Sequence, residues 1–225
     1  MADHLVNADF SRRVVISTYE LPWVPSPQGG VERRLLDRVG NEIARATSLV
    51  RYAPASMFPA HGHALGEEFL VLDGIFSDEH GDYPAGTYVR NPPGSRHSPR
   101  TAPGCTIFVK LRQMSPTEER RVVVDTTTAE WRPGGVEGHA RLGLYSANPE
   151  GEQVTMERLR AGAELSEADC SGAEEIFVVS GDLGDDQGTY GLGTWIRNPT
   201  GYRCRLKSVG GATYWAKRGH FYPTQ

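Results

Sequence analysis

The feature that most constrains the fold of this chain is a long internal repeat. Glu67-Glu68-Phe69 recurs as Glu174-Glu175-Ile176, and Tyr88-Val-Arg-Asn-Pro92 recurs as Trp195-Ile-Arg-Asn-Pro199. Four glycines keep the same offset of 107 positions: Gly74 and Gly181, Gly81 and Gly188, Gly86 and Gly193, Gly94 and Gly201. A period near one hundred residues is too long for the unit of a solenoid. The repeat therefore indicates duplication of a complete small domain.

We accordingly expect two domains, one spanning residues 1–124 and the other residues 125–225, with the linker near Asp125 to Glu130. Short runs rich in β-branched and aromatic residues, such as Thr47–Tyr52 and Thr106–Leu111, alternate with Gly and Pro, which is typical of strands joined by tight turns. No stretch keeps a helical period, and the best helical candidate is the short segment Met114–Arg121. The chain should be nearly all β.

Composition excludes several classes of protein. The 225 residues are 38% hydrophobic and 23% charged, with a formal net charge of -4, which is ordinary for a folded globular protein and unlike a disordered, collagenous or coiled-coil chain. Because charges of both signs are interspersed, no basic field would gather nucleic acid. No apolar run approaches the roughly 20 residues that span a bilayer, and the start lacks the plan of a signal peptide. We expect a cytoplasmic protein without direct nucleic-acid or membrane partners.

Three histidines and one glutamate form a metal-binding pattern. His61 and His63 are two positions apart, so both imidazoles lie on one face if the segment is a strand. Glu67 begins the next apolar run, and His97 follows the turn at Pro92-Pro-Gly94. Such a set leaves coordination positions open for water or a small-molecule ligand on an ion that accepts five or six ligands. We predict that His61, His63, Glu67 and His97 bind one divalent metal.

These residues also carry a family resemblance. Pro59-Ala-His-Gly-His-Ala-Leu-Gly-Glu67 with Gly74 resembles the first cupin motif, and Gly86 with Pro92-Pro-Gly-Ser-Arg-His97 resembles the second. The resemblance implies two tandem cupin barrels, that is, an all-β double-stranded β-helix or jelly roll, with a metal inside the first barrel. Cupins commonly associate through strand exchange, so a homodimer is expected.

A more specific resemblance is to the ChrR-like cupins, named for the C-terminal domain of zinc-binding anti-sigma factors. It rests on Thr47–Tyr52, Gly66–Phe69, Gly74–Tyr83 and Tyr88–Pro92. The family implies zinc, whereas the ligand types alone also admit Fe(II), Mn and Ni. Residues 1–20 are too short for the helical domain that grips a sigma factor, so we expect no direct sigma-factor binding.

The second repeat tests the pattern within the same chain. The offset of 107 places Ala168, Cys170, Glu174 and Cys204 where the first repeat has its ligands. One interpretation is a degenerate barrel kept for packing. The alternative is a second site in which Cys170, Glu174 and Cys204 bind zinc, or in which the two cysteines form a disulfide. Cys105 is expected to be a buried small hydrophobe.

Other residues are weaker candidates. Tyr52, Tyr88 and Arg90 are candidates for the pocket, and Arg90 and its repeat partner Arg197 either face that pocket as anion clamps or pair with a carboxylate of the sheet. Asp78-Glu79-His80-Gly81 is interpreted as a hairpin turn rather than a second metal site. Two functions stay open, a metal-binding sensor related to the anti-sigma factors and a metal-dependent cupin dioxygenase acting on a small organic substrate; the catalytic residues are not identified.

Overall fold

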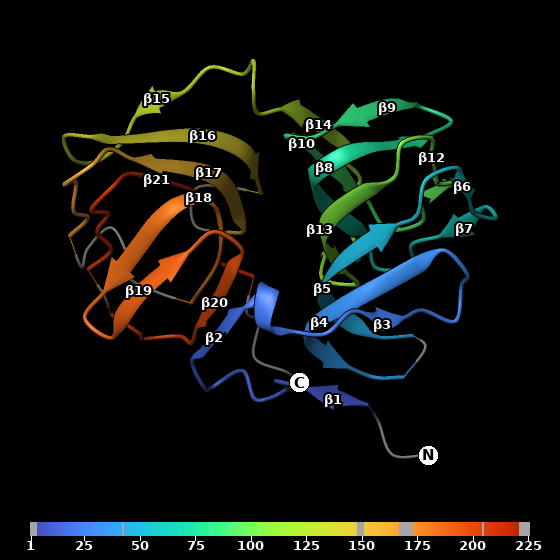
Figure 1. The fold of residues 1–225 in the computed structure, drawn as a ribbon, viewed down its shortest axis with the longest axis horizontal. Coiled ribbons are helices and arrows are strands. Elements are labelled where there is room, and N and C mark those ends of the chain that lie inside the picture. The colour runs from blue at the N-terminus through green and yellow to red at the C-terminus, as the bar shows by residue number, and fades with distance from the viewer. Residues whose placement is uncertain (1–3, 42, 148–150, 167–172, 204, 221–225) are drawn as a thin grey trace. The chain divides into compact units, whose positions relative to one another are not determined.

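The computed structural model describes residues 4–41, 43–147, 151–166, 173–203 and 205–220. The chain divides into two compact units, Met1–Ala8 with Leu21–Thr128, and Asp9–Glu20 with Ala129–Gln225. We call these the first and the second barrel. Both are built from antiparallel strands, so the all-β prediction is confirmed (Figure 1). Among the described residues no helix is long and apolar enough to cross a membrane.

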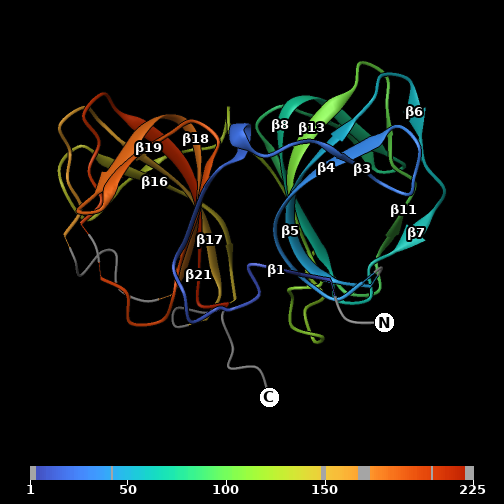
Figure 2. The same ribbon diagram turned by 60° about the horizontal axis from the view of Figure 1, so that its bottom comes forward.

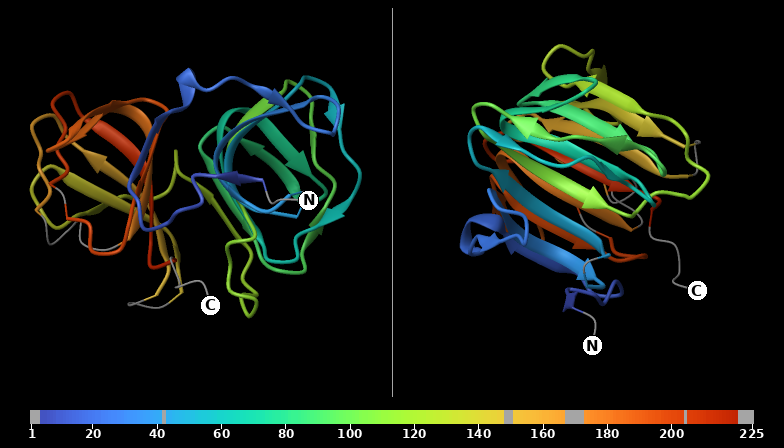
Figure 3. Two further views of the ribbon diagram at one scale, coloured as in Figure 1. Left: turned by 90° about the horizontal axis from the view of Figure 1, so that it is seen from below. Right: turned by 90° about the vertical axis from the view of Figure 1, so that its right-hand side faces the viewer.

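The two barrels share one strand order. In the first barrel it is β1-β4-β5-β13-β8-β10-β14, and in the second it is β15-β16-β17-β21-β18-β20-β2. The strands of each barrel curve around its own interior (Figure 3). The elements of the first barrel are β1 (Leu5–Val6), β3 (Val24–Pro25), β4 (Val31–Val39), β5 (Arg45–Tyr52), β6 (Ser56–Met57), β7 (His61–Gly62), β8 (Glu67–Asp78), β9 (Gly81–Pro84), β10 (Thr87–Asn91), β11 (Arg96–His97), β12 (Arg100–Thr101), β13 (Cys105–Leu111) and β14 (Val122–Asp125). Those of the second are β2 (Val14–Ser17), the 3-10 turn η1 (Thr18–Glu20), β15 (Arg132–Pro133), β16 (His139–Ser146), β17 (Gln153–Leu159), β18 (Glu174–Asp185), β19 (Gly188–Gly191), β20 (Thr194–Asn198) and β21 (Ala212–Arg218).

Two short strands take equivalent places in the two barrels. β14 pairs with β10, with Val122 opposite Arg90. At the equivalent place in the second barrel β2 pairs with β20, with Val14 opposite Arg197. β14 and β2 are the end strands of the two strand orders, and β2 belongs to the second barrel although it precedes the first in the sequence.

The segment Met114–Arg121 is not a helix, so that sequence prediction was wrong. A turn replaces it, in which the backbone N–H of Glu118 donates to the carbonyl of Ser115 at 3.0 Å. Pro116 has no N–H to donate and disfavours helical backbone at Ser115 before it. Met114 is nonetheless buried, so the segment is held by this side chain and not by helical hydrogen bonds.

A β-bulge in β8 decides which side chains enter the first barrel. Val71 pairs with Ile107 and Asp73 pairs with Thr106, so Leu72 is an extra residue. The bulge shifts the alternation of faces: Glu67, Phe69 and Val71 face the interior before it, and Phe76 and Asp78 face the interior after it. The buried core consists of Val31, Val50, Phe69, Val71, Phe76, Tyr83, Val89, Cys105, Ile107 and Val109.

Gly74, just after the bulge, allows the close approach of β8 to the turn before β13. Its φ is 73°, and a Cβ added there would lie 2.0 Å from the carbonyl oxygen of Gly104. Gly181 has the same role in the second barrel, where a Cβ would lie 1.9 Å from the carbonyl oxygen of Gly211. The repeat of these glycines therefore has a steric cause.

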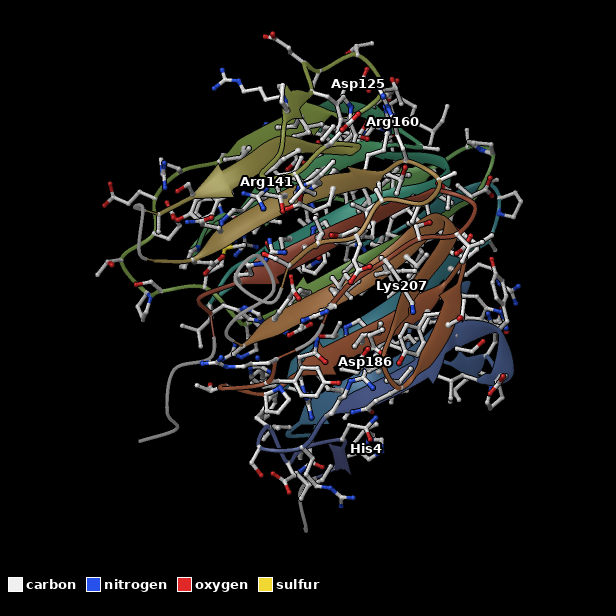
Figure 4. All side chains as sticks on the ribbon, turned by 90° about the vertical axis from the view of Figure 1, so that its left-hand side faces the viewer. His4, Asp125, Arg141, Arg160, Asp186 and Lys207 are labelled. Carbon is white, nitrogen blue, oxygen red and sulfur yellow. The ribbon has the colours of Figure 1, made fainter. Side chains whose placement is uncertain are left out.

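The second barrel encloses buried charges where the first has apolar side chains. Glu157, which is fully buried, takes the place of Val50, and Arg218 takes that of Leu111. The carboxylate of Glu157 accepts hydrogen bonds from His139 at 2.6 Å, Arg141 at 2.8 Å and Arg218 at 3.2 Å. Burial alone would raise the pKa of Glu157, but these three partners outweigh burial and lower it. An ionic cluster thus lies beside the apolar core of the second barrel, and its member Arg141 belongs to β16 (Figure 4).

We predict that Gly74→Ala destabilises the protein by about 2–4 kcal/mol, because the new Cβ meets backbone that cannot move aside. Gly94→Ala is the matched control: φ is 82° there as well, but nothing lies within 4 Å of the added Cβ, so only the conformational cost of about 1–2 kcal/mol applies. Denaturant unfolding measures both. Equal losses would contradict the steric explanation.

We also predict that Glu157→Gln costs about 3–5 kcal/mol at neutral pH, because Arg141 and Arg218 lose the buried negative charge with which they pair. Since the folded pKa of Glu157 is lowered, its contribution is present above about pH 4.3 and is lost as the pH falls through the folded value. The gap between wild type and variant should therefore close in acid. Asp186→Asn, at an exposed position of the same barrel (Figure 4), should change the stability by under about 0.5 kcal/mol. Unfolding curves at several pH values test this, and a variant as stable as wild type at pH 7 would contradict it.

Candidate metal centre

The three histidines are brought together by a short strand pair. β7 and β11 are antiparallel, and His97 lies directly opposite His61 (Figure 2). The ladder continues beyond β7, because the N–H of His63 donates to the carbonyl of Ser95 at 3.0 Å and its carbonyl accepts from Gly94 at 2.8 Å. His61 and His63 therefore face the same side, as the spacing predicted.

The side chains converge at one point. The ligand nitrogens of His61, His63 and His97 all lie within 4.8 Å of one another. Glu67 Oε2 lies 3.6 Å from Nε2 of His63 and 3.6 Å from Nε2 of His97. Donor atoms bound to one ion at about 2.0–2.2 Å are separated by roughly 3–3.5 Å. The contacts of Glu67 come close to this spacing, and the three imidazole nitrogens lie near enough to one another to be candidate ligands of one ion.

His97 is oriented by a buried carboxylate that the sequence analysis did not assign to the site. Its Nδ1 lies 3.3 Å from Oδ2 of Asp78. Oδ1 of Asp78 accepts from the backbone of His80 at 2.8 Å and from the hydroxyl of Tyr83 at 2.9 Å. Burial would raise the pKa of Asp78, but these hydrogen bonds lower it to about 2. Asp78 therefore stays ionised and fixes Nε2 of His97 toward the other imidazoles.

The protonation of the imidazoles follows from their surroundings. Burial is the largest effect on His63 and lowers its pKa, so this ring favours the neutral form that binds metals. Burial also disfavours the charged form of His97, but Asp78 and Glu67 outweigh it, and the pKa of His97 is raised. Nε2 of His63 and Nε2 of His97 are buried and find no hydrogen-bond partner among the described residues. Buried polar atoms of this kind are costly unless something else binds them.

A cavity of about 510 Å³ opens at this cluster. Its wall includes His61, His63 and Glu67, and on the opposite strands Tyr52 and apolar side chains. Of the sequence candidates for the pocket, Tyr52 lines it. Three imidazoles and one carboxylate could hold a divalent ion at the cavity wall, with its remaining positions turned to the enclosed space.

Tyr88 and Arg90 lie elsewhere. Both hydrogen-bond Glu68, at 2.6 Å and 2.9 Å, on the face of the sheet opposite Glu67. Neighbouring residues of a strand point to opposite faces, so Glu67 and Glu68 serve different purposes. Arg90 thus has the carboxylate-pairing role that the sequence left open. Arg197 donates to the carbonyl of Asp9 at 2.9 Å and stacks on Phe10.

The second set of candidates falls largely outside the described residues, since Ala168, Cys170 and Cys204 are not among them. Glu174 is described and forms an ion pair with Arg218. Burial raises the pKa of Glu174, and the charge of Arg218 opposes this effect. The repeat partner of Glu67 therefore has a guanidinium as its neighbour.

Two smaller predictions are confirmed. Asp78 and Gly81 pair across the turn formed by Glu79 and His80, so this segment is a hairpin. Cys105 is buried in the core of the first barrel, and burial raises the pKa of its thiol to about 11, as expected for an unreactive thiol.

Comparison with solved structures shows the fold. A proposed dioxygenase from Nostoc punctiforme aligns with a TM-score of 0.75 at 13% identity, covering 95% of this chain and 88% of that one. A proposed glyoxylate-induced protein from Pseudomonas aeruginosa aligns with a TM-score of 0.76 at 14% identity, covering 100% and 94%. Oxalate decarboxylase from Bacillus subtilis gives 0.62 at 12% identity, covering 93% and 78%.

No curated protein matches the sequence. The family model described as the ChrR cupin-like domain matches residues 11–115 and again residues 119–222. Both repeats of the sequence are thereby covered, and the strand order of the two barrels agrees with the duplication. The chain belongs to the ChrR cupin-like family and carries two copies of its domain.

Proposed function

We propose that this protein is a metal-dependent cupin enzyme, of the dioxygenase type, that acts on a small organic molecule in the first barrel. The observation that carries the proposal is the convergence of His61, His63, Glu67 and His97, the first three of which line a cavity of about 510 Å³. A purely structural ion needs no adjoining cavity.

Three of the four candidate ligands would have a support within the protein. Asp78 would hold His97, and the carbonyl of Pro59, 3.2 Å from Nδ1 of His61, would hold that ring. Glu67 would be held by the side-chain amide of Asn91, which donates at 3.3 Å. A bound divalent ion would supply Lewis acidity or, as Fe(II), one-electron chemistry with dioxygen. The apolar cavity walls would exclude bulk water from the bound molecule.

The identity of the metal separates this proposal from a second one. The anti-sigma factors that give the family its name suggest zinc and a regulatory role, in which a bound ligand alters a partner contact. Fe(II), Mn or Ni would fit the same imidazole and carboxylate donors and would favour an oxygenase. The enclosed cavity beside the ligands favours chemistry on a small molecule.

The first prediction concerns metal content. Protein purified without added metal should contain about one divalent ion per chain, and His61→Ala/His97→Ala should contain almost none. The matched control is His4→Ala/His80→Ala, because both of these histidines are exposed and outside the cluster. Elemental analysis measures all three proteins. Equal metal in both double variants would remove the proposed site.

The next prediction concerns catalytic turnover. Wild type loaded with Fe(II) should consume oxygen in the presence of one member of a panel of small diketones and phenols, and His61→Ala/His97→Ala should not. One zinc per chain with no uptake across the panel would instead support the regulatory alternative.

A further prediction concerns the carboxylate behind His97. Asp78→Asn keeps the size of the side chain but removes its charge, so zinc affinity should fall about 10–100-fold. Asp82→Asn, on the same hairpin but exposed, should leave the affinity unchanged. Titration against a competing chelator measures both, and equal affinities would show that Asp78 does not support the metal.

A further inference from the structure

We propose that the cavity of the first barrel binds a small organic carboxylate, with Arg33 binding the carboxylate group and the apolar body lying between Arg33 and the histidine cluster. This inference names the substrate class of the site described above and thus rests on the proposed function.

Arg33 faces the cavity because of its place in β4. Val31 belongs to the buried core, so the alternation of the strand turns Arg33 to the same interior face and Arg34 to the other. Arg34 accordingly stacks on Trp23, with 4.3 Å between its guanidinium carbon and the ring centre. Arg33 lines the same cavity as His61, His63, Glu67 and Tyr52.

The charges around the cavity are unbalanced. In the part of the chain that the structure describes, Arg33 hydrogen-bonds Ser26 and forms no ion pair with a carboxylate. Arg38 and Arg112 also line the cavity, and Glu67 is the one described carboxylate in its wall. Burial lowers the pKa of Arg38, and repulsion by Arg33 lowers it further. Two guanidinium groups therefore lie at one partly open cavity, which attracts an anion.

In the second barrel, the arginine at the equivalent position is neutralised by a carboxylate of the protein itself. Arg33 pairs across the sheet with Val50. In the second barrel Arg141 holds the equivalent place in the strand pairing, opposite Glu157, and the two side chains form an ion pair at 2.8 Å. The duplication thus contains an arginine with an internal carboxylate and one whose partner position is apolar. The difference leaves the guanidinium of Arg33 available to a ligand.

The other residues of the cavity wall indicate the chemistry of the rest of the ligand. Val31, Val50, Phe58, Val109 and Leu111 offer apolar surface. Burial and the charge of Glu67 raise the pKa of Tyr52, so its hydroxyl stays protonated and can donate a hydrogen bond. A monocarboxylate with an apolar body matches this combination of one cationic end and apolar walls.

The test uses benzoate and its neutral isostere benzamide, with binding measured by calorimetry. Wild type should bind benzoate at least tenfold more tightly than benzamide. Arg33→Gln should weaken benzoate binding about 10–100-fold and leave benzamide binding unchanged. Arg51→Gln is the matched control, because this arginine pairs with Glu32 on the exposed face; it should behave as wild type.

Val50→Glu is the second variant, and it gives the first barrel the carboxylate that the second barrel has. It should abolish the preference for benzoate while Arg33 is still present. Unfolding curves and circular dichroism establish that each variant is folded.

Each measurement is made on zinc-loaded and on chelator-treated protein, so that the two proposals can fail separately. A preference for benzoate that depends on Arg33 in both preparations supports the inference, even if the purified protein holds no metal. One metal per chain with equal binding of benzoate and benzamide overturns the inference and leaves the metal site intact. Loss of the preference in Arg51→Gln would overturn it as well.

Discussion

Two buried imidazole nitrogens, Nε2 of His63 and Nε2 of His97, set the constraint on which the first barrel depends. Neither has a hydrogen-bond partner among the described residues, and leaving such atoms unbound in an apolar interior costs about 1–3 kcal/mol each. The neighbouring described residues hold the site in place without hydrogen-bonding these two nitrogens. Asp78 fixes His97 from behind, and Asn91 holds Glu67 beside both rings. A divalent ion bound by both nitrogens would remove this cost.

The two barrels differ in how their buried charged groups are paired. In the second barrel, Glu157 accepts hydrogen bonds from His139, Arg141 and Arg218, and Glu174 forms an ion pair with Arg218. The corresponding space of the first barrel has apolar side chains and an open cavity. Two barrels with closely similar strand orders therefore differ inside: one has a cluster of ion pairs, and the other has a cavity lined by histidines and arginines.

The sequence analysis named the four residues of the candidate site but did not name Asp78, which orients His97. The i, i+2 spacing of His61 and His63 and the glycine turns are local signals. They predicted the all-β fold, which is confirmed, and a metal site of four residues, which stays a prediction although the structure brings the three imidazoles together. Asp78 was missed because the bulge at Leu72 changes which face of β8 it occupies, and a bulge leaves no mark on alternation alone. The placement of β14 depends on pairs such as Arg90 with Val122, and that of β2 on pairs such as Val14 with Arg197. Periodicity cannot reveal pairing between residues so far apart in the sequence.

The measurement that tests the central claim most directly is X-ray absorption at the zinc edge of the zinc-loaded protein. The account predicts a first shell of nitrogen and oxygen only, at about 2.0–2.2 Å, with the multiple scattering of three imidazoles. A sulfur contribution at about 2.3 Å would contradict it, because the three cysteines of the chain are Cys105, in the apolar core, and Cys170 and Cys204 of the second repeat. Such a result would move the metal out of the histidine cluster.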